Sequence, residues 1–279
     1  MVRHRRLFLI AASVAALATV RPSAAQQPTL QKIASESVIE QIKSRGSLRI
    51  GLDTFVPWAM PSKDGKLIGF EVDVATKLAA DMGVKLELVP TAWDGIIPAL
   101  VSGKFDFIIG GLTITPKRAL TINFSNPYDY GETLAVVNKK VAPNITTLAQ
   151  LNSPDVTFAT RRGATSGVTV SDVFPKAKVV AFDDENSMQQ EFVSGNVMAL
   201  MPTTPTPALI ESRFPDITLV IHQPLARSAS GVGMRKGDAD ALAFVNSWVG
   251  VNTENHWLQE RHKYWFDGRS WTAMVDGAK

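Results

Sequence analysis

The sequence predicts an α/β fold of two similar units, each with a mixed, mostly parallel sheet flanked by helices. Short apolar runs alternate along the chain with amphipathic stretches that end at glycine, as strands and helices do in such folds. This pattern restarts after Tyr128, and the last two helical stretches complete the first unit. We therefore expect the second unit to be inserted into the first, with two crossings between them.

The first unit is expected to alternate strands with helices of ordinary length. In the helix at 71–82, Val72, Ala75 and Leu78 share one face, and Gly83 ends it. Residues 65–70 are expected to form a turn. The predicted helices span 35–45, 71–82 and 93–102, and the predicted strands span 48–51, 85–90 and 107–109.

The second unit shows the same alternation, followed by a return to the first. A strand at 134–138 is expected to leave the first unit, and one at 231–236 to return to it. Residues 238–249 and 254–264 are expected to be closing helices. Between the crossings the predicted strands span 156–160, 178–182, 197–201 and 218–221, and the predicted helices span 168–173, 185–194 and 208–213.

The N-terminus has the features of a secretory signal. Arginines at positions 3, 5 and 6 precede an apolar stretch at 7–20 that is too short to span a bilayer. Ser23-Ala24-Ala25 suits signal peptidase, so residues 1–25 are expected to be cleaved and the protein exported to a periplasm. The adjacent Arg5 and Arg6 leave twin-arginine export open as the minor option.

Composition excludes several classes of function. The chain carries 29 basic and 26 acidic residues. Removing the four arginines of the signal would leave 25 basic residues and a charge of about −1, so nothing argues for nucleic acid or an anionic membrane surface as a partner. Beyond the signal no apolar run reaches membrane length, so no direct membrane insertion is expected. The absence of cysteine excludes disulfides, thiolate metal sites and a lipid-anchored cysteine. The three histidines beyond residue 25 lack metal-ligand spacing, so we expect neither metal nor cofactor.

One stretch combines groups that suit a carboxylate. After the apolar run at 107–109, Gly110 and Gly111 let the backbone approach a ligand closely. Thr113 offers a hydroxyl, and Arg118 follows in a short helix that Thr115 and Pro116 begin. Backbone donors and a guanidinium fork at a strand-to-helix junction favour a carboxylate receptor. A surface turn with a solvated arginine explains the same residues equally well.

The ordered features resemble the extracytoplasmic solute-binding proteins of ABC importers, specifically the polar amino-acid family (bacterial extracellular solute-binding protein family 3). The resemblance covers nearly the whole chain after residue 25. Its most specific parts are Gly69-Phe-Glu-Val-Asp73, the segment 94–106, Gly111-Leu-Thr-Ile-Thr-Pro-Lys-Arg118 and Phe124-Ser-Asn-Pro-Tyr128.

The resemblance implies a two-lobed, type II (Venus-flytrap) fold that closes on a solute without catalysing a reaction. It implies a first lobe of residues 26–133 and 229–279, and a second lobe of residues 134–228. Ligand binding would select the closed population. The implied partners are a small carboxylate-bearing solute, with an amino acid favoured, and a membrane-embedded ABC permease, with the binding protein itself monomeric. A receptor in place of the importer stays open.

The resemblance also implies roles for individual residues. Arg118 and Thr113 would hold the ligand α-carboxylate, with Thr165, Arg161 and Ser166 facing it from the second lobe. The carbonyls of Gly111 and Gly110 would face an α-ammonium. Phe55 and Trp93 would sandwich the ligand side chain, and Asp53 would reach its polar end. Core packing for the two aromatic residues, and loop capping for Asp53, are the alternatives.

One position departs from the family pattern. Thr203 stands where an aspartate usually pairs with the ligand ammonium. A neutral hydroxyl cannot balance that charge once it is taken out of water, which would cost binding free energy on the order of 2–5 kcal/mol. Two interpretations follow. In the first, the ammonium meets another acid, such as Asp53 or Glu132. Alternatively, the ligand is a carboxylate without an α-ammonium, which Arg118 and Arg161 would suit.

An enzyme is the rival class. A periplasmic cyclohexadienyl or prephenate-type dehydratase shares this architecture and needs a desolvated carboxylic acid as its proton donor. The resemblance places that acid just after the usual aspartate, where this chain has only threonine, proline and alanine. Glu191, on the preceding helix, is expected to face solvent, so we expect a protein without catalytic residues.

Overall fold

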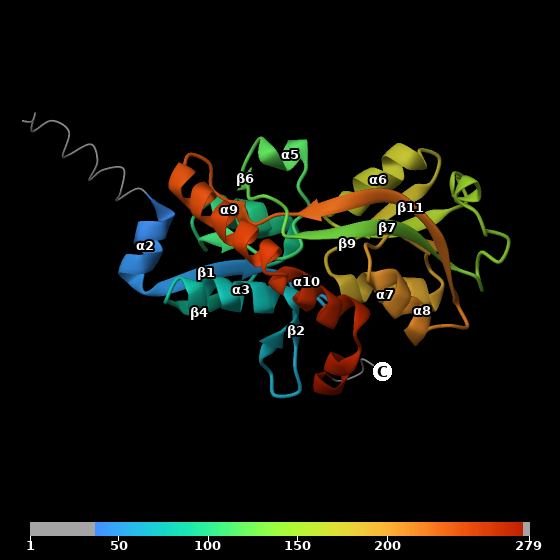
Figure 1. Ribbon diagram of the computed structural model, residues 1–279. Coiled ribbons are helices and arrows are strands. Elements are labelled where there is room, and N and C mark those ends of the chain that lie inside the picture. Colours follow the sequence, from blue (N-terminus) through green and yellow to red (C-terminus); the bar gives the residue numbers. More distant parts are fainter. Residues whose placement is uncertain (1–36, 276–279) are drawn as a thin grey trace, which may run out of the picture. The chain divides into compact units, whose positions relative to one another are not determined.

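The computed structural model describes residues 37–275 and places two five-stranded sheets in them (Figure 1). The expected signal at 1–25 lies outside the described residues. Four strands of the first sheet run in one direction and β12 runs against them. The first sheet has the order β4 (Lys85–Pro90), β1 (Ser47–Leu52), β5 (Phe107–Ile108), β12 (Gly233–Met234) and β6 (Asn123–Phe124).

The second sheet repeats this arrangement. Here β7 runs against the four other strands, so both sheets are mixed but mostly parallel, as predicted. Its order is β11 (Thr218–Ser230), β7 (Asp129–Asn138), β10 (Ala199–Leu200), β8 (Thr157–Arg161) and β9 (Lys178–Phe182).

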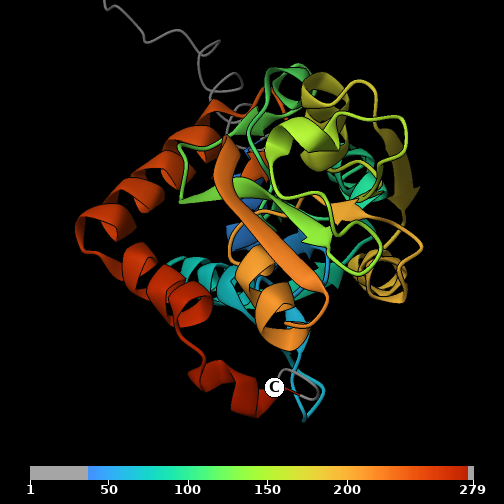
Figure 2. The same ribbon diagram turned by 90° about the vertical axis from the view of Figure 1, so that its right-hand side faces the viewer.

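The helices follow the predicted order, with differences at their ends. The first unit contains α2 (Val38–Arg45), α3 (Phe70–Asp81), η1 (Trp93–Gly95) with α4 (Ile96–Val101), and α5 (Pro116–Ala119). The second contains η2 (Leu148–Leu151), α6 (Thr165–Val173), α7 (Glu185–Ser194) and α8 (Thr206–Arg213). The chain closes with α9 (Ala239–Glu254), α10 (Trp257–His262), the π-helical turn η3 (Lys263–Asp267) and η4 (Ser270–Met274), drawn in red in Figure 2.

Several expectations were wrong in detail. The strand expected at 134–138 already begins at Asp129, as β7, and the one expected at 231–236 is reduced to Gly233–Met234, as β12. The turn expected at 65–70 contains a strand, β3 (Leu67–Ile68), which pairs with β2 (Met60–Pro61), because backbone groups on either side of the loop bond to each other. The strand expected at 218–221 extends to Ser230 as β11, since its pairing with β7 resumes after a register shift between Ile221 and Ala226. The hydrophobic pattern of residues 222–225 does not indicate that β11 pairs with β7 again after them.

The long strands β7 and β11 connect the two sheets. They pair with each other in the second sheet, while Tyr128, just before β7, donates its N–H to Ser230 O (3.0 Å). Ser230 also bridges Thr113, and Ile114 donates its N–H to Ala229 O (2.8 Å). One end of this ribbon therefore lies against the first sheet, and the other end belongs to the second. The expected lobe boundaries at 133/134 and 228/229 fall inside these strands.

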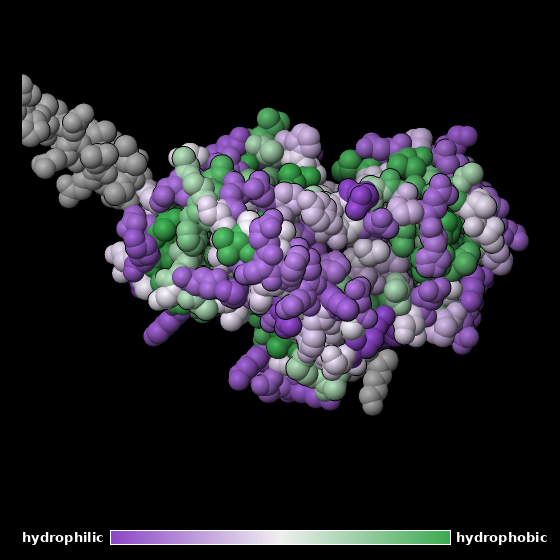
Figure 3. All heavy atoms as spheres, viewed as in Figure 1, coloured by the Kyte–Doolittle hydropathy of each residue, from purple (hydrophilic) through white to green (hydrophobic). Residues whose placement is uncertain are grey.

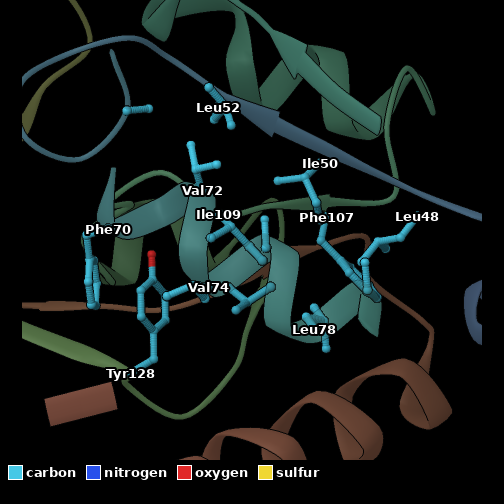
Figure 4. Packing of buried hydrophobic residues seen from close by; sticks show 14 of the residues in the cluster. Leu48, Ile50, Leu52, Phe70, Val72, Val74, Leu78, Phe107, Ile109 and Tyr128 are labelled. Atoms are coloured by element: carbon cyan, nitrogen blue, oxygen red, sulfur yellow. The ribbon is translucent and has the colours of Figure 1, made fainter. Parts of the chain in front are cut away.

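The core of the first unit holds the loops after β1 and β5 in place. Leu48, Ile50 and Leu52 of β1 pack with one face of α3 and with Phe107 (Figure 4). Next to β5, the fully buried Asp106 forms ion pairs with Arg45 and with Arg49 (2.9 Å for Arg49). The carboxylate also accepts the Arg49 backbone N–H (2.8 Å), which fixes β5 against β1.

On the face shown in Figure 3, hydrophilic residues predominate and the hydrophobic ones form separate patches. Within residues 37–275, no helix has the length and apolar character needed to cross a membrane.

Candidate functional site

A cavity of ≈ 110 Å³ lies where loops from both sheets meet. The segments after β5, β8 and β10 all contribute to it, as expected for a site at the carboxyl ends of parallel strands. Its first-lobe wall includes Phe55, Trp58, Trp93, Gly111, Thr113 and Arg118. Its second-lobe wall includes Arg161, Thr165, Ser166, Glu185, Met201 and Thr203, and the connecting strands add Asp129, Gly131, Ser228 and Ser230.

Arg118 is held by local structure at the edge of this cavity. Thr115 caps α5 by accepting the Arg118 N–H (3.2 Å), and Pro116 occupies the first turn, as the sequence predicted. The guanidinium donates to Thr113 O (2.8 Å) and, across the cleft, to Gly163 O (3.0 Å). Within residues 37–275 it forms no salt bridge. Burial and the charge of Arg161 lower the pKa of Arg118 to about 10.

The second lobe presents the N-terminus of α6 to the cavity. Thr165 and Ser166 are its first residues, and N–H groups in the first helical turn have no partner inside the helix. Gly163 precedes them with φ +74°, and a Cβ there would lie 3.3 Å from Asp94 Cα. The left-handed φ favours glycine there, and a side chain would crowd the Asp94 backbone of the first lobe. Helix-terminal donors facing a guanidinium suit an anion.

Arg161 lies in the corner formed by two aromatic rings, Phe55 and Trp93, which contact each other edge to face with centroids 6.4 Å apart. Its guanidinium carbon is 4.7 Å from the Phe55 ring centroid and 4.5 Å from that of Trp93. Its Nη1 lies 3.2 Å from Asp53 Oδ2. Burial lowers the pKa of Arg161, although the charges of Glu185 and Asp53 oppose this shift. Burial raises the pKa values of both carboxyls, and the charge of Arg161 opposes that.

The cavity also contains an acid that sequence reasoning missed. Asp129, the first residue of β7, is buried, lines the cavity and lies 2.6 Å from His262 Nδ1. Burial lowers the pKa of His262, but the hydrogen bond and charge of Asp129, with Asp267, leave it raised. The position directly after the motif that ends at Tyr128 was the one available signal.

A buried acid lies behind the glycine loop. Glu71 accepts the Tyr128 hydroxyl hydrogen (2.8 Å), and that hydroxyl accepts the Gly111 N–H (3.3 Å). Burial raises the pKa of Glu71 to about 8, against opposing hydrogen bonds from Tyr128 and Gly111. The sequence placed Glu71 in a family motif without assigning it a role.

Thr203 belongs to a neutral wall of hydroxyl groups. It pairs with Thr133 through a β-bridge, and Thr204, Thr206 and Ser228 line the cavity beside it. A Cβ added at Gly131 would lie only 2.4 Å from Thr203 Cγ2, so the glycine there admits the threonine side chain.

The cavity brings together most of the expected site residues. Phe55, Trp93, Gly111, Thr113, Arg118, Arg161, Thr165, Ser166 and Thr203 line it. Gly110 is buried beside Leu52 and Trp93, and Asp53 lies against Arg161; neither lines the cavity. Glu132 and Glu191 are also absent from its walls. Trp58, Asp129 and Glu185 were missed because their positions depend on how distant segments pack.

The fold and site define an extracytoplasmic solute-binding protein with two lobes around a cleft. Residues 48–268 match the bacterial extracellular solute-binding proteins, family 3, and the chain belongs to this family, as predicted. The described residues contain no cluster of three or more His, Asp and Glu side chains that could hold a metal.

Three similar proteins illustrate the range of the family. The L-cystine-binding protein of Escherichia coli (strain K12) is 30% identical over 85% of this chain and 89% of its own length. The crystal structure of an ancestral amino acid-binding protein, a precursor of cyclohexadienyl dehydratase, has a TM-score of 0.75 and 35% identity, covering 82% of this chain and all of that one. The cyclohexadienyl dehydratase of Pseudomonas aeruginosa is 27% identical over 86% of this chain and 90% of its own.

Proposed function

We propose that this protein captures an amino acid between its lobes and delivers it to an ABC importer permease. In this proposal residues 1–25 are a cleaved signal, and the remaining chain acts as a monomer in the periplasm. The observation that carries the proposal is Arg118, a half-buried guanidinium without a carboxylate partner among the described residues, facing the N-terminus of α6 across the cavity.

The proposed pose places the ligand carboxylate between the two lobes. Arg118 and Thr113 would bind it from the first lobe, and the N–H groups of Thr165 and Ser166 from the second. The Arg118 bond to Gly163 O shows that the guanidinium reaches the second lobe. A carboxylate that bonds both walls has more partners in the closed cleft than in an open one, so binding favours closure.

The ligand ammonium requires an acid other than the usual aspartate. Both carboxylate oxygens of Asp53 are engaged, by the Thr54 N–H and by Arg161, and Glu132 does not line the cavity, whereas His262 contacts only the Oδ1 atom of Asp129. Asp129 lines the cavity and is buried. We therefore assign the ammonium to Asp129, with the Gly111 carbonyl beside it. The nearby hydroxyls of Ser228 and Ser230 would complete its hydrogen bonds.

A dehydratase of the prephenate type is the second candidate, and one observation favours it. Glu185 lines the cavity and its pKa is raised by burial, which is the state a proton donor needs. The charge of Arg161 opposes that shift. In addition, the chain has only threonine, proline and alanine where the family resemblance places the catalytic carboxylic acid of a dehydratase. Binding without catalysis is therefore the favoured function.

A thermal-shift screen tests the proposal, because a ligand that binds only the folded state raises the melting temperature by mass action. The screen contains the common amino acids, the corresponding acids without an amino group, and prephenate. Stabilisation by at least one amino acid is expected. Stabilisation only by acids that lack the amino group would exclude the amino-acid assignment, and turnover of prephenate would establish the dehydratase.

A further inference from the structure

The cleft contains a complete binding site for a guanidinium group, and the chain fills it with its own Arg161. Two aromatic rings at a steep angle to each other, Phe55 at 4.7 Å and Trp93 at 4.5 Å, contact the guanidinium from two adjacent sides. Asp53 accepts a charged hydrogen bond at 3.2 Å. Aromatic faces and a carboxylate are the groups that recognise a planar cation. A cationic amino-acid side chain would need the same groups.

The fit of Arg161 leaves no room for a second cation there. The Arg161 side chain is only 8% exposed, so its head group and its stem both occupy the slot. Phe55 and Trp93 form an edge-to-face pair with their centroids 6.4 Å apart, and the Arg161 guanidinium fills the corner between their faces, so a second cation cannot contact both rings while Arg161 is there. A free ammonium or guanidinium nearby would also be repelled by Arg161 and Arg118.

We propose that Arg161 determines specificity by occupying the side-chain subsite, which excludes arginine and lysine and selects amino acids with small, uncharged side chains. This inference rests on the proposed amino-acid site at Arg118. It differs from the role expected from the sequence, in which Arg161 helped to hold the ligand carboxylate.

The space that remains supports the size and charge of this ligand class. The whole cavity, carboxylate site included, measures only ≈ 110 Å³, and its walls beyond the carboxylate site include hydroxyl groups, glycine and methionine, among them Thr203, Ser228 and Met201. Arg161 already faces two carboxyls, Asp53 and Glu185. An acidic ligand side chain would therefore be repelled by these two carboxylates, whereas an uncharged side chain would not be repelled.

The test is to remove Arg161 and measure which amino acids bind. Purified wild type, Arg161→Ala, Arg161→Leu and Arg161→Lys are titrated calorimetrically with L-arginine, L-lysine, L-serine and L-alanine. Wild type and Arg161→Lys should not bind L-arginine. Arg161→Ala should bind L-arginine at least 100-fold more tightly than wild type, with a rise of several degrees in melting temperature. Adding Asp53→Asn to Arg161→Ala should abolish that gain.

The possible results separate this inference from the proposed function. Absence of binding by wild type to any amino acid would contradict the proposed function, and the inference with it. Binding of L-serine or L-alanine by wild type, together with a folded Arg161→Ala that gains no L-arginine binding, would overturn the inference alone. If neither alanine nor leucine variant folds, the wild-type titration decides: L-arginine binding as tight as that of uncharged amino acids refutes the inference, and its absence supports it.

Discussion

Replacing Arg118 by alanine should abolish high-affinity ligand binding without unfolding the protein. The guanidinium bonds only to two backbone carbonyls, Thr113 O and Gly163 O, among the described residues, so the ligand carboxylate would be its main anionic partner. Truncating one member of a buried charge pair costs about 2–5 kcal/mol. At 1.4 kcal/mol for each factor of ten, affinity should fall roughly 30-fold to 4,000-fold.

Isothermal titration calorimetry with the tightest ligand from the screen measures this loss. Arg162→Ala is the matched control, because Arg162 is a neighbouring arginine that is 52% exposed and paired with Asp183 outside the cavity. Its affinity should equal that of wild type. Arg118→Lys should recover only part of the loss, since an ammonium cannot match the planar fork. Wild-type affinity in a folded Arg118→Ala would show that the carboxylate binds elsewhere.

Three further predictions concern other residues of the cleft and its support. Asp129→Asn should weaken amino-acid binding at least tenfold in calorimetry yet leave the binding of the corresponding acid without an amino group unchanged; an equal loss for both ligands would contradict its role. Glu71 has a folded-state pKa of about 8 against 4.5 ordinarily, so the folded state binds the extra proton between these values. The free energy of unfolding should therefore fall by on the order of a few kcal/mol as pH rises from about 4.5 to 8. Denaturant melts at several pH values should show a weaker dependence of this free energy on pH for Glu71→Gln than for wild type. An unchanged pH dependence would exclude Glu71 as the cause. Asp106→Ala should cost about 3–5 kcal/mol in urea unfolding because it leaves Arg45 and Arg49 without their shared carboxylate, and a loss below 1 kcal/mol would show that they are otherwise solvated.

Local sequence patterns determined the elements and much of one wall of the site. The α5 start was predicted from Thr115 and Pro116 alone, because a capping hydroxyl and a first-turn proline act within four residues. Gly195 likewise ends α7 in the left-handed conformation that glycine favours. Gly111, Thr113 and Arg118 lie within eight residues of one another, so their convergence could be inferred before the fold was known.

The tertiary structure decided what those local groups meet. Asp129 lines the cavity because β7 crosses between the sheets, and apart from its place directly after the motif that ends at Tyr128, the sequence carries no sign of that position. Arg161 and Arg162 are adjacent, and the sequence could not say which of the two is buried or what it contacts. The contacts of Arg161 with Phe55, Trp93 and Asp53 depend on how the two lobes approach each other. Asp53 alone is 108 positions away from Arg161 in the sequence. Contacts between separate elements depend on the packing of both, and no local pattern encodes that.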